Sequence, residues 1–264
     1  MLADRMRVAI PGGLVRDGAR RAEAELRALS GHEEERLAFS RGTPLPARVS
    51  ELLGACASFG EDVRELIAGD RDYLMLELRR MTLGERYLLV VRCPSGGHVF
   101  DVEFAADDVT ITRNALHAQT HAAEIGGRTM TFRLPTGADQ EAVARLPLPA
   151  AVDALFERCA ISPAASALDP AERELLAAAM ERVAPQAALD LDLTCPECGA
   201  AFEEPFDPAA FFFRELRDAG HDLLRDVHEL ARAYHWNEAE ILALSRPRRL
   251  AYLQLVHDAR GASA

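Results

Sequence analysis

The sequence lacks a long hydrophobic run, and it is short of basic residues. No apolar stretch of the 264-residue chain approaches the ~18 residues that a membrane-spanning helix needs, and no apolar signal-peptide core follows the first residues. We therefore expect a cytoplasmic protein with no membrane partner. The 30 basic and 42 acidic side chains give a net charge of −12. This balance argues against nucleic acid as the main partner, because a nucleic-acid-binding surface is rich in Lys and Arg.

Cysteine is also scarce, and the five cysteines do not suit a disulfide framework, because their number is odd. Two of them stand in the stretch Cys195-Pro196-Glu197-Cys198-Gly199. Thiolates at this spacing can reach one tetrahedral ion, and the glycine suits a tight turn, so this is the pattern of a zinc knuckle. A knuckle supplies only two of the four ligands. Cys56 and Cys159, by contrast, lie on apolar helix faces and are expected to be small buried hydrophobic residues.

Catalytic motifs are absent from the sequence as well. It contains no phosphate-binding loop, no nucleophile elbow and no pair of carboxylates placed for acid–base catalysis. His117 and His121 would share one face of a helix with Glu124 nearby, yet no glutamate follows His117, so the zinc-protease pattern fails. We expect a protein that is not an enzyme, with no catalytic residues, no bound organic cofactor and no small-molecule substrate.

The chain contains an internal repeat. Arg92–His98 aligns with Thr194–Ala200 at an offset of 102 residues. Upstream, seven of the 13 residues from Leu45 to Ala57 are identical to those from Leu148 to Ala160. Similarity that keeps the same order along both segments predicts two copies of one unit, at residues 45–107 and 148–209.

The repeat suggests that two knuckles face each other and share one zinc ion. Cys93 aligns with Cys195, but Gly96 stands where the second cysteine of the first knuckle is expected. His98 is the substitute within reach, and an imidazole nitrogen is an ordinary zinc ligand. We predict one structural zinc held by Cys93, His98, Cys195 and Cys198. In the alternative, the site is degenerate, Cys93 is only buried and the metal is lost or weakly held.

The periodicity of the apolar residues predicts an α+β fold. Each copy is expected to form two helices followed by a zinc-ribbon-like hairpin. The second copy is expected to run into a long amphipathic helix, about Ala209–His235, and then into short C-terminal helices that begin after Asn237 and at Ser245. The predicted segments are an N-terminal arm (1–44), repeat unit 1 with the degenerate knuckle (45–107), an inter-repeat β segment (108–147), repeat unit 2 (148–209) and a C-terminal helical segment (210–264).

The N-terminal arm gives three local predictions. The alternation from Met6 to Ile10 predicts a short strand that ends at Pro11-Gly12-Gly13. The alternating segment Ala22–Leu29 suits either a strand or a helix. Ser30 forms a capping box with Glu33, which predicts a helix over Glu33–Phe39.

The C-terminal segment carries the predicted partner-binding surface, because it has no counterpart after the first copy. The single tryptophan lies at a capped helix junction, where a large aromatic side chain can anchor an interface. A basic cluster at the start of the last helix could pair with acidic groups of a partner. The residues predicted for this surface are Trp236, Arg246, Arg248, Arg249, Leu250, Tyr252 and Leu253. In the alternative, the last helix packs back on the long helix and its arginines are only solvated.

Four stretches of the sequence together resemble one family: residues 24–35, residues 132–137, the knuckle at 195–199, and the tail at 236–245 with Arg248-Arg249 and Tyr252-Leu253. They are similar to the baseplate proteins and baseplate-hub assembly chaperones of T-even-like phages and of phage-derived contractile injection systems. The resemblance implies a non-enzymatic assembly chaperone or structural factor for the baseplate hub, with hub or spike-proximal tail subunits as partners. The first knuckle departs from the family's pattern, because it lacks the second cysteine expected there.

A zinc-ribbon nucleic-acid-binding regulatory protein is the competing interpretation. Knuckles of this kind occur in such regulators, and Arg246, Arg248 and Arg249 could contact phosphate groups. The cluster is small for a nucleic-acid footprint, and the net charge of −12 opposes the binding of a polyanion.

Overall fold

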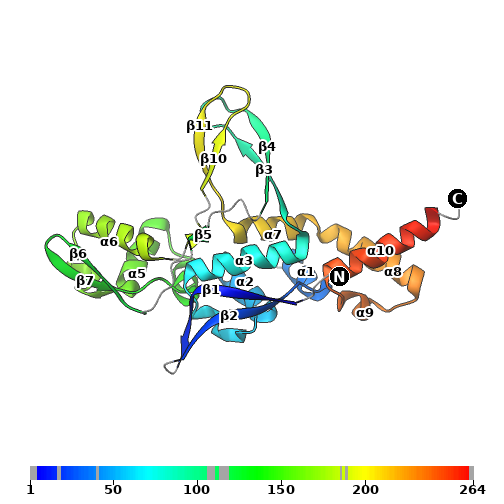
Figure 1. Ribbon diagram of the computed structural model, residues 1–264, viewed down its shortest axis with the longest axis horizontal. Helices are drawn as coiled ribbons and strands as arrows, with labels where there is room; N and C mark the ends of the chain where they lie inside the picture. Colours follow the sequence, from blue (N-terminus) through cyan, green and yellow to red (C-terminus); the bar gives the residue numbers. More distant parts are fainter. Residues whose placement is uncertain are drawn as a thin grey trace.

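The computed structural model describes residues 5–16, 19–39, 42–105, 111–112, 119–184, 186–187 and 190–261. The fold is α+β, as the sequence predicted: helices alternate with strands that form small antiparallel sheets. Figure 1 shows an elongated arrangement. A central block built on α2 and α3 lies between an end that contains α5 and α6 and an end that contains α8 and α10, and two hairpins project from the block.

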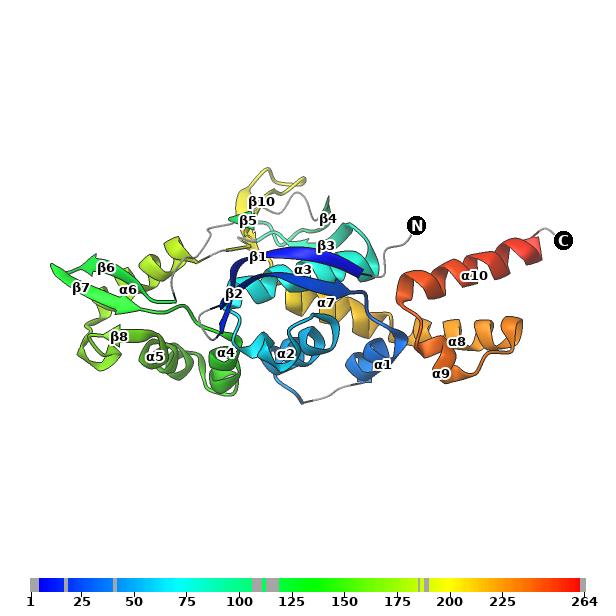
Figure 2. The same ribbon diagram turned by 60° about the horizontal axis from the view of Figure 1, so that its bottom comes forward.

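The N-terminal arm begins with a long antiparallel hairpin of strands β1 (Arg5–Arg16) and β2 (Ala19–Arg27). Apolar residues alternate with polar ones along both strands, so one face of the hairpin is buried. Figure 2 shows this hairpin lying over the central helices. The ambiguous segment 22–29 is therefore strand as far as Arg27.

The prediction that the first strand ends at Pro11 is wrong. A register shift after Ala9 accommodates the Pro-Gly-Gly sequence as a bulge, and the strand continues beyond it. The N–H groups of Gly12 and Gly13 donate to the carboxylate of Asp70 at 2.9 and 2.8 Å. The bulge thus ties the hairpin to the helix beneath it.

The helices of the central block are α1 (Gly31–Phe39), α2 (Leu45–Cys56), the short 3-10 helix η1 (Gly60–Arg64), α3 (Ala68–Leu83) and α7 (Pro208–Asp218). Their apolar faces and that of the hairpin form one core, in which Leu26, Leu53, Leu74 and Phe212 are fully buried. The first helix begins at Gly31, two residues before the predicted start.

The start of α1 is held by the predicted Ser30–Glu33 pair. The Glu33 carboxylate accepts bonds from the Ser30 N–H at 2.8 Å and from the Ser30 hydroxyl at 2.6 Å. It also accepts hydrogen bonds from both terminal nitrogens of Arg27, at 2.9 and 3.1 Å. Burial alone would raise the pKa of Glu33, but these hydrogen bonds outweigh it and lower the pKa to about 2.

Glu33→Gln should therefore lower the free energy of unfolding by about 2 kcal/mol at pH 7. The carboxylate stabilises the fold above its unfolded pKa near 4.5, and this contribution is lost as the pH falls towards 2. The difference between wild type and variant, measured by urea unfolding, should be constant above pH 5 and shrink below it. Glu35→Gln removes one charge from the same helix turn and is the control. A Glu33→Gln effect that persisted undiminished at pH 2.5 would contradict the assignment.

The end of the molecule beside α5 combines a small sheet with three helices. Strands β6 (His121–Ile125), β7 (Arg128–Phe132) and β8 (Ala160–Ser162) form the sheet. The helices are α4 (Gly137–Val143), α5 (Leu148–Cys159) and α6 (Pro170–Val183), with a 3-10 turn η3 (Ala165–Ala167) before the last. Two short strands, β5 (Ile111–Thr112) and β9 (Gln186–Ala187), pair with each other.

The two projecting hairpins are separate two-stranded sheets. They are β3 (Arg86–Arg92) with β4 (Val99–Ala105), and β10 (Asp190–Thr194) with β11 (Ala201–Pro205). Their apolar faces meet in a shared aromatic cluster. Phe100 packs edge-on against Phe202 at 6.4 Å, and Phe104 packs edge-on against Phe206 at 5.3 Å. Side chains, rather than a backbone ladder, therefore join the two hairpins.

The prediction of one long helix from Ala209 to His235 is wrong. The segment forms α7 and a second helix, α8 (Gly220–Tyr234), with a break at Ala219. Glycine is a poor helix former, and Gly220 lies against α1, where an added Cβ would come 3.0 Å from Ala38 Cβ. Both halves pack on α1, but α7 also packs on α2 and α3, whereas α8 packs on α10.

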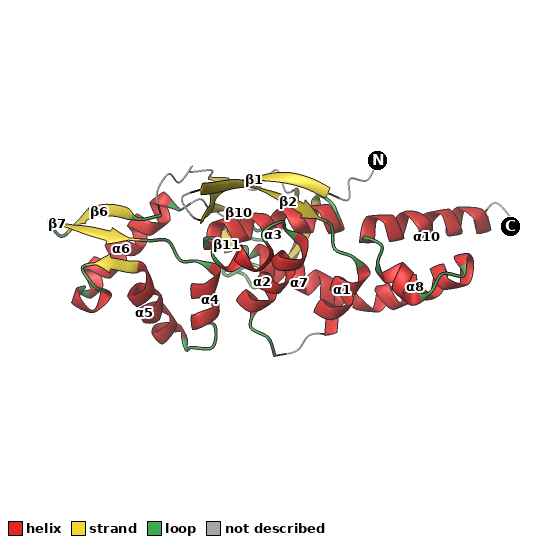
Figure 3. Ribbon diagram, turned by 90° about the horizontal axis from the view of Figure 1, so that it is seen from below, coloured by secondary structure: helices red, strands yellow, loops and turns green. Residues whose placement is uncertain are grey.

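Two further helices complete the chain, α9 (Glu238–Leu242) and α10 (Arg246–Gly261). The predicted capping box at Asn237 is present, with reciprocal bonds to Glu240. Figure 3, seen from below, shows α8 and α10 side by side at one end of the molecule. Leu230, Ile241 and Leu253 form the core of this end.

Candidate metal centre

The two knuckles lie at the tips of the two hairpins (Figure 1). The turn after β3 has the Cys93 N–H donating to the His98 carbonyl at 2.8 Å and the Gly97 N–H donating to the Cys93 carbonyl at 2.9 Å. The turn after β10 makes the same two bonds at Cys195, both 2.9 Å. Gly97 and Gly199 have φ of 68° and 72°, a backbone conformation that glycine adopts without strain. Two chain segments far apart in sequence thus form the same turn.

These turns bring together the four residues that the sequence predicted as ligands: Cys93, His98, Cys195 and Cys198. Their ligand atoms all lie within 4.8 Å of one another. Cys93 Sγ is 3.6 Å from Cys198 Sγ, and Cys195 Sγ is 3.6 Å from His98 Nδ1. A zinc–sulfur bond of about 2.3 Å implies tetrahedral edges of about 3.8 Å. The cluster therefore has the dimensions of a four-coordinate metal site, and it could hold a metal ion.

Gly96 explains how histidine replaces the missing cysteine. A Cβ added at Gly96 would lie 2.3 Å from Cε1 and 2.5 Å from Nδ1 of His98. The imidazole therefore occupies the space that a side chain at position 96 would need, and it reaches the other three ligands through that space. Glycine at 96 and histidine at 98 are thus two parts of one arrangement.

The hydrogen bonds of Cys93 favour its thiolate. The Gly96 N–H donates to Cys93 Sγ at 3.3 Å, and this bond is the main cause that lowers the pKa of Cys93 to about 7. The bond from the Ala200 N–H alone would lower the pKa of Cys198, but the neighbouring Cys195 and Cys93 outweigh it and raise that pKa. Cys93 and Cys195 are each 1% exposed, whereas Cys198 is exposed. Four protein ligands would fill a tetrahedral shell, so no position remains for a substrate or an activated water. Chemically, this arrangement suits a structural ion.

Among the described residues, no further cysteine or histidine belongs to this cluster. Cys56 and Cys159 are buried, and burial raises their pKa values to about 12 and about 11, so their thiols stay protonated and behave as hydrophobic groups, as the sequence indicated. His121 lies in strand β6 rather than in a helix, which removes the helical face considered for it. His117 lies outside the described residues.

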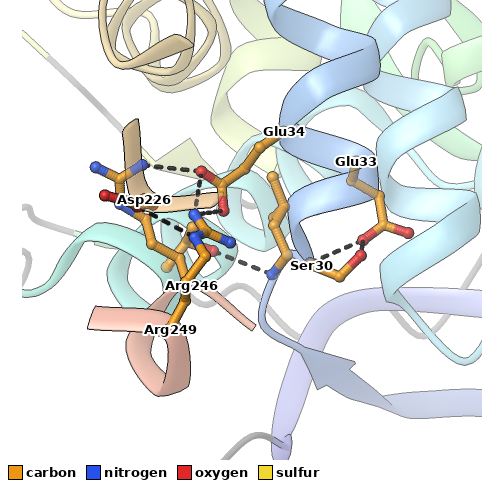
Figure 4. Close-up of polar contacts among 8 residues, drawn as sticks. Ser30, Glu33, Glu34, Asp226, Arg246 and Arg249 are labelled. Carbon is orange, nitrogen blue, oxygen red and sulfur yellow. Dashed lines mark hydrogen bonds and ion pairs between the residues drawn. The ribbon is translucent and has the colours of Figure 1, made fainter. Parts of the chain in front are cut away.

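The predicted partner-binding arginines have a different environment from the one expected. Arg249 is fully buried, and its guanidinium donates to both oxygens of Glu34 at 2.9 and 3.0 Å. It also contacts Asp226 at 3.2 Å, and Arg246 donates to Glu34 at 2.9 Å (Figure 4). Arg249 therefore joins α10 to α1 and α8 inside the protein, and it is not available to a partner in this structure.

The remaining residues of the predicted surface divide into buried and accessible ones. Leu253 is buried in the core of the α8–α10 end, so it also fails the prediction of a partner contact. Trp236 and Tyr252 are half-buried. Trp236 stacks on Tyr234, and Tyr252 packs edge-on against both rings, 5.0 Å from the indole. Leu250 is 45% exposed.

The acidic partners of Arg249 were missed in the sequence. Glu34 stands in an acidic run with the pattern of solvated surface, yet it is 3% exposed. Its partner lies 215 residues away, and no local pattern links the two. The glycine at position 31 is the one local hint of a close contact at the start of α1. In the structure, a Cβ added there would come 2.9 Å from Leu242 Cα, so the two backbones meet at this point.

A family model of T4 bacteriophage base plate proteins matches residues 15–162, which is more than half of the chain. The matched region includes Cys93 and His98, whereas Cys195 and Cys198 lie beyond it. No curated protein and no solved structure matches the chain. Among the helices that the structure describes, none has the length and apolar character needed to cross a bilayer. The chain belongs to the family of T4 bacteriophage base plate proteins, which supports a structural role in a phage-type baseplate.

Proposed function

We propose that this protein is a non-enzymatic assembly chaperone or structural factor for the baseplate hub of a contractile tail or injection system. The family match carries the proposal, because it assigns more than half of the chain to baseplate proteins. The assignment to the hub, with hub or spike-proximal subunits as partners, rests on the resemblance of the arm and tail sequences. A cluster of four metal ligands that leaves no open position supports a scaffold rather than an enzyme.

We propose zinc as the occupant of the metal cluster, with one ion per chain. Three thiolates and one imidazole are a usual set for structural zinc, and calcium and magnesium prefer oxygen ligands. The ion would join β3–β4 to β10–β11 at their tips, where no backbone hydrogen bonds connect the two described hairpins. Its role would be to fix these hairpins as one rigid projection.

We also propose that the protein arose by duplication of a unit longer than the sequence comparison indicated. Apart from short 3-10 helices and the strands β8 and β9 of the second copy, the order hairpin, helix, helix, helix, hairpin occurs once from β1 to β4 and again from β6 to β11. In each copy a carboxylate in the first helix accepts a bond from a backbone N–H three residues earlier, Glu33 from Ser30 and Asp139 from Thr136. In each copy an arginine three residues before that N–H group binds the same carboxylate through both terminal nitrogens: Arg27 binds Glu33 and Arg133 binds Asp139.

The exposed part of the C-terminal end is the proposed contact for the hub subunit. Leu250 is 45% exposed, and Arg248, two residues before it, is also exposed. Arg249 lies between them, is buried, and anchors α10 through its ion pair with Glu34. A deletion of α10 would leave Glu34 buried without Arg249 and would destabilise the fold. A loss of partner binding in that variant could then result from unfolding rather than from a lost contact. Point substitutions on the exposed face test the proposal more sharply.

Leu250→Glu should reduce capture of the hub subunit at least tenfold when the protein is co-expressed with the neighbouring tail genes and pulled down. The substitution places a charge at a desolvated contact while the folded state keeps its core. Leu224→Glu is the matched control, because Leu224 is an equally accessible leucine, 49% exposed, on helix α8. Equal capture by wild type and the Leu250 variant would move the contact elsewhere. Capture of no tail subunit by the wild type would contradict the proposed function itself.

The nucleic-acid alternative is tested by a gel shift on unrelated DNA. A regulator of that class would bind at low salt and release as salt rises. We expect no shift at 20 mM salt, because Arg246 and Arg249 pair with Glu34 inside the protein and the net charge is −12. Salt-sensitive binding would favour the alternative over the baseplate role.

A further inference from the structure

An open apolar groove lies between α5 and α6, the two helices at the far end of the molecule in Figures 1 and 2. Its volume is about 320 Å³. Helix α5 contributes Val152, Leu155 and Phe156, and α6 contributes Ala177 and Met180. Val152 is 42% exposed. Within α5 only Cys159 is buried, and Leu155 and Phe156 are half-buried, so the residues that the structure describes leave part of this apolar face uncovered.

The central block contains the counterpart of this groove in closed form. By the sequence alignment of the two copies, the five groove residues correspond to Val49, Leu52 and Leu53 of α2 and to Met75 and Leu78 of α3. All five counterparts are buried, at 5% exposure or less. The same surface is thus open in one copy and covered in the other.

Helix α7 lies against both helices that form the central groove. It packs on α1, α2 and α3, and it inserts Ala209, Phe212, Phe213 and Leu216 into the core. These residues follow the spacing i, i+3, i+4 and i+7, which is the pattern of an amphipathic helix bound in a groove. At the rim, Arg79 binds the Glu215 carboxylate of α7 with two bonds, at 3.0 and 2.6 Å.

We propose that the α5–α6 groove binds an amphipathic helix of a partner protein in the way that the central groove binds α7. The inference rests on the duplication proposed above, and it adds a second contact surface to the proposed function. The partner helix presents large apolar or aromatic residues at the same spacing. Glu181 stands where the central groove has Arg79, so the partner carries a basic or neutral residue in place of Glu215.

The occupant is a different protein rather than a second copy of this chain. Helix α7 is the segment of matching shape, but it is fixed in its own molecule on two sides. Phe212 and Phe213 lie in the central core, and Phe211 lies in the aromatic cluster beneath the hairpins. Releasing α7 for exchange would open both cores, and burial on that scale stabilises the fold strongly.

A labelled peptide tests the groove directly. The probe is residues 207–219 of this chain with Glu215→Arg. The substitutions Ala210→Glu and Arg214→Lys, at positions exposed in α7, allow a lactam between their side chains that holds the peptide helical. Fluorescence anisotropy against the full-length protein should show saturable binding. Ala177→Glu should weaken it at least tenfold, because the carboxylate enters the apolar groove. Ala178→Glu, at the next and also exposed position of α6, should leave it unchanged.

Three results would overturn the proposal: no saturable binding of the peptide, equal losses with the two alanine variants, or a wild-type dimer in light scattering that Ala177→Glu makes monomeric. The last result would identify a second copy as the occupant. Because this assay contains no tail subunit, it fails or succeeds independently of the pull-down with Leu250→Glu. Failure here would leave the baseplate assignment in place.

Discussion

Replacing Cys198 with serine is expected to release the metal and to lower the free energy of unfolding by an amount on the order of 5 kcal/mol. The binding energy of a structural ion is folding energy, because the unfolded chain holds no preformed site. The effect should be smaller than the roughly 10–16 kcal/mol of isolated zinc-finger peptides. Phe100 still packs on Phe202, and Phe104 on Phe206, when the ion is gone.

The loss of stability in the Cys198→Ser variant should appear first in the two hairpins and only then in the rest of the molecule. A two-stranded hairpin is marginally stable by itself. In the described residues, β3–β4 and β10–β11 are joined by the apolar side chains of their shared cluster and by the metal ligands, without a backbone ladder. Metal analysis should find about one zinc in the wild type and none in the Cys198→Ser variant. Hydrogen exchange should rise first in the two hairpins, while the central block keeps its protection. Cys159→Ala is the control, because that cysteine is buried far from the cluster and should leave the zinc content unchanged.

Position 96 gives a second test of the same site. Gly96→Ala should reduce the zinc content although it removes no ligand, because the new Cβ would lie 2.3 Å from His98 Cε1. Gly96→Cys combined with His98→Ala should restore binding through four thiolates. If His98→Ala alone keeps the full zinc content, the ligand assignment of His98 is wrong. Wild-type protein that contains no zinc after expression with ample zinc would remove the site altogether.

The predictable part of this structure follows from local chemistry and from the repeat. The knuckle spacing at Cys195 and Cys198 was visible directly. The alignment of Cys93 with Cys195 then placed the first hairpin beside the second, and their ligand atoms lie within 4.8 Å. The helix start after Asn237 followed from capping preferences.

The parts that could not be predicted depend on contacts between distant segments. Nothing near Pro11 indicates that Asp70 will receive the N–H groups of the bulge. The apolar stripe from α7 into α8 is continuous in sequence, and both halves pack on α1, but only α7 reaches α2 and α3 and only α8 packs on α10, with a break at Ala219 between them. Arg249 has the sequence pattern of an exposed cation, and only its distant partner Glu34 makes it an interior residue.

Arg249→Ala should therefore be among the most destabilising single substitutions in the C-terminal end, at about 3–5 kcal/mol. The guanidinium is 0% exposed and Glu34 is 3% exposed, so removing Arg249 leaves a buried carboxylate with Arg246 as its remaining partner. Arg248→Ala, at the adjacent exposed position, should change stability by about 0.5 kcal/mol or less. Urea unfolding of the two variants side by side measures the contrast.

The part of the Arg249→Ala variant that unfolds first should also show which segment the substitution destabilises. The backbones of Gly31 and Arg246 bond to Leu244 and Leu29 at 3.2 Å each, so the ion pair lies beside a backbone bridge between α1 and α10. Without the pair, limited proteolysis should cut first between α8 and α10, while the zinc content stays unchanged.

Screening by salt is weak for buried charges, so the loss of stability in Arg249→Ala should be similar at 0.1 and 1 M salt. The double variant Glu34→Gln, Arg249→Met should lose less than the sum of the single changes, because the Glu34 carboxylate is then no longer buried without Arg249. Additive losses would mean that the two side chains stabilise the fold independently, and the pair would not be the joint between α1 and α10.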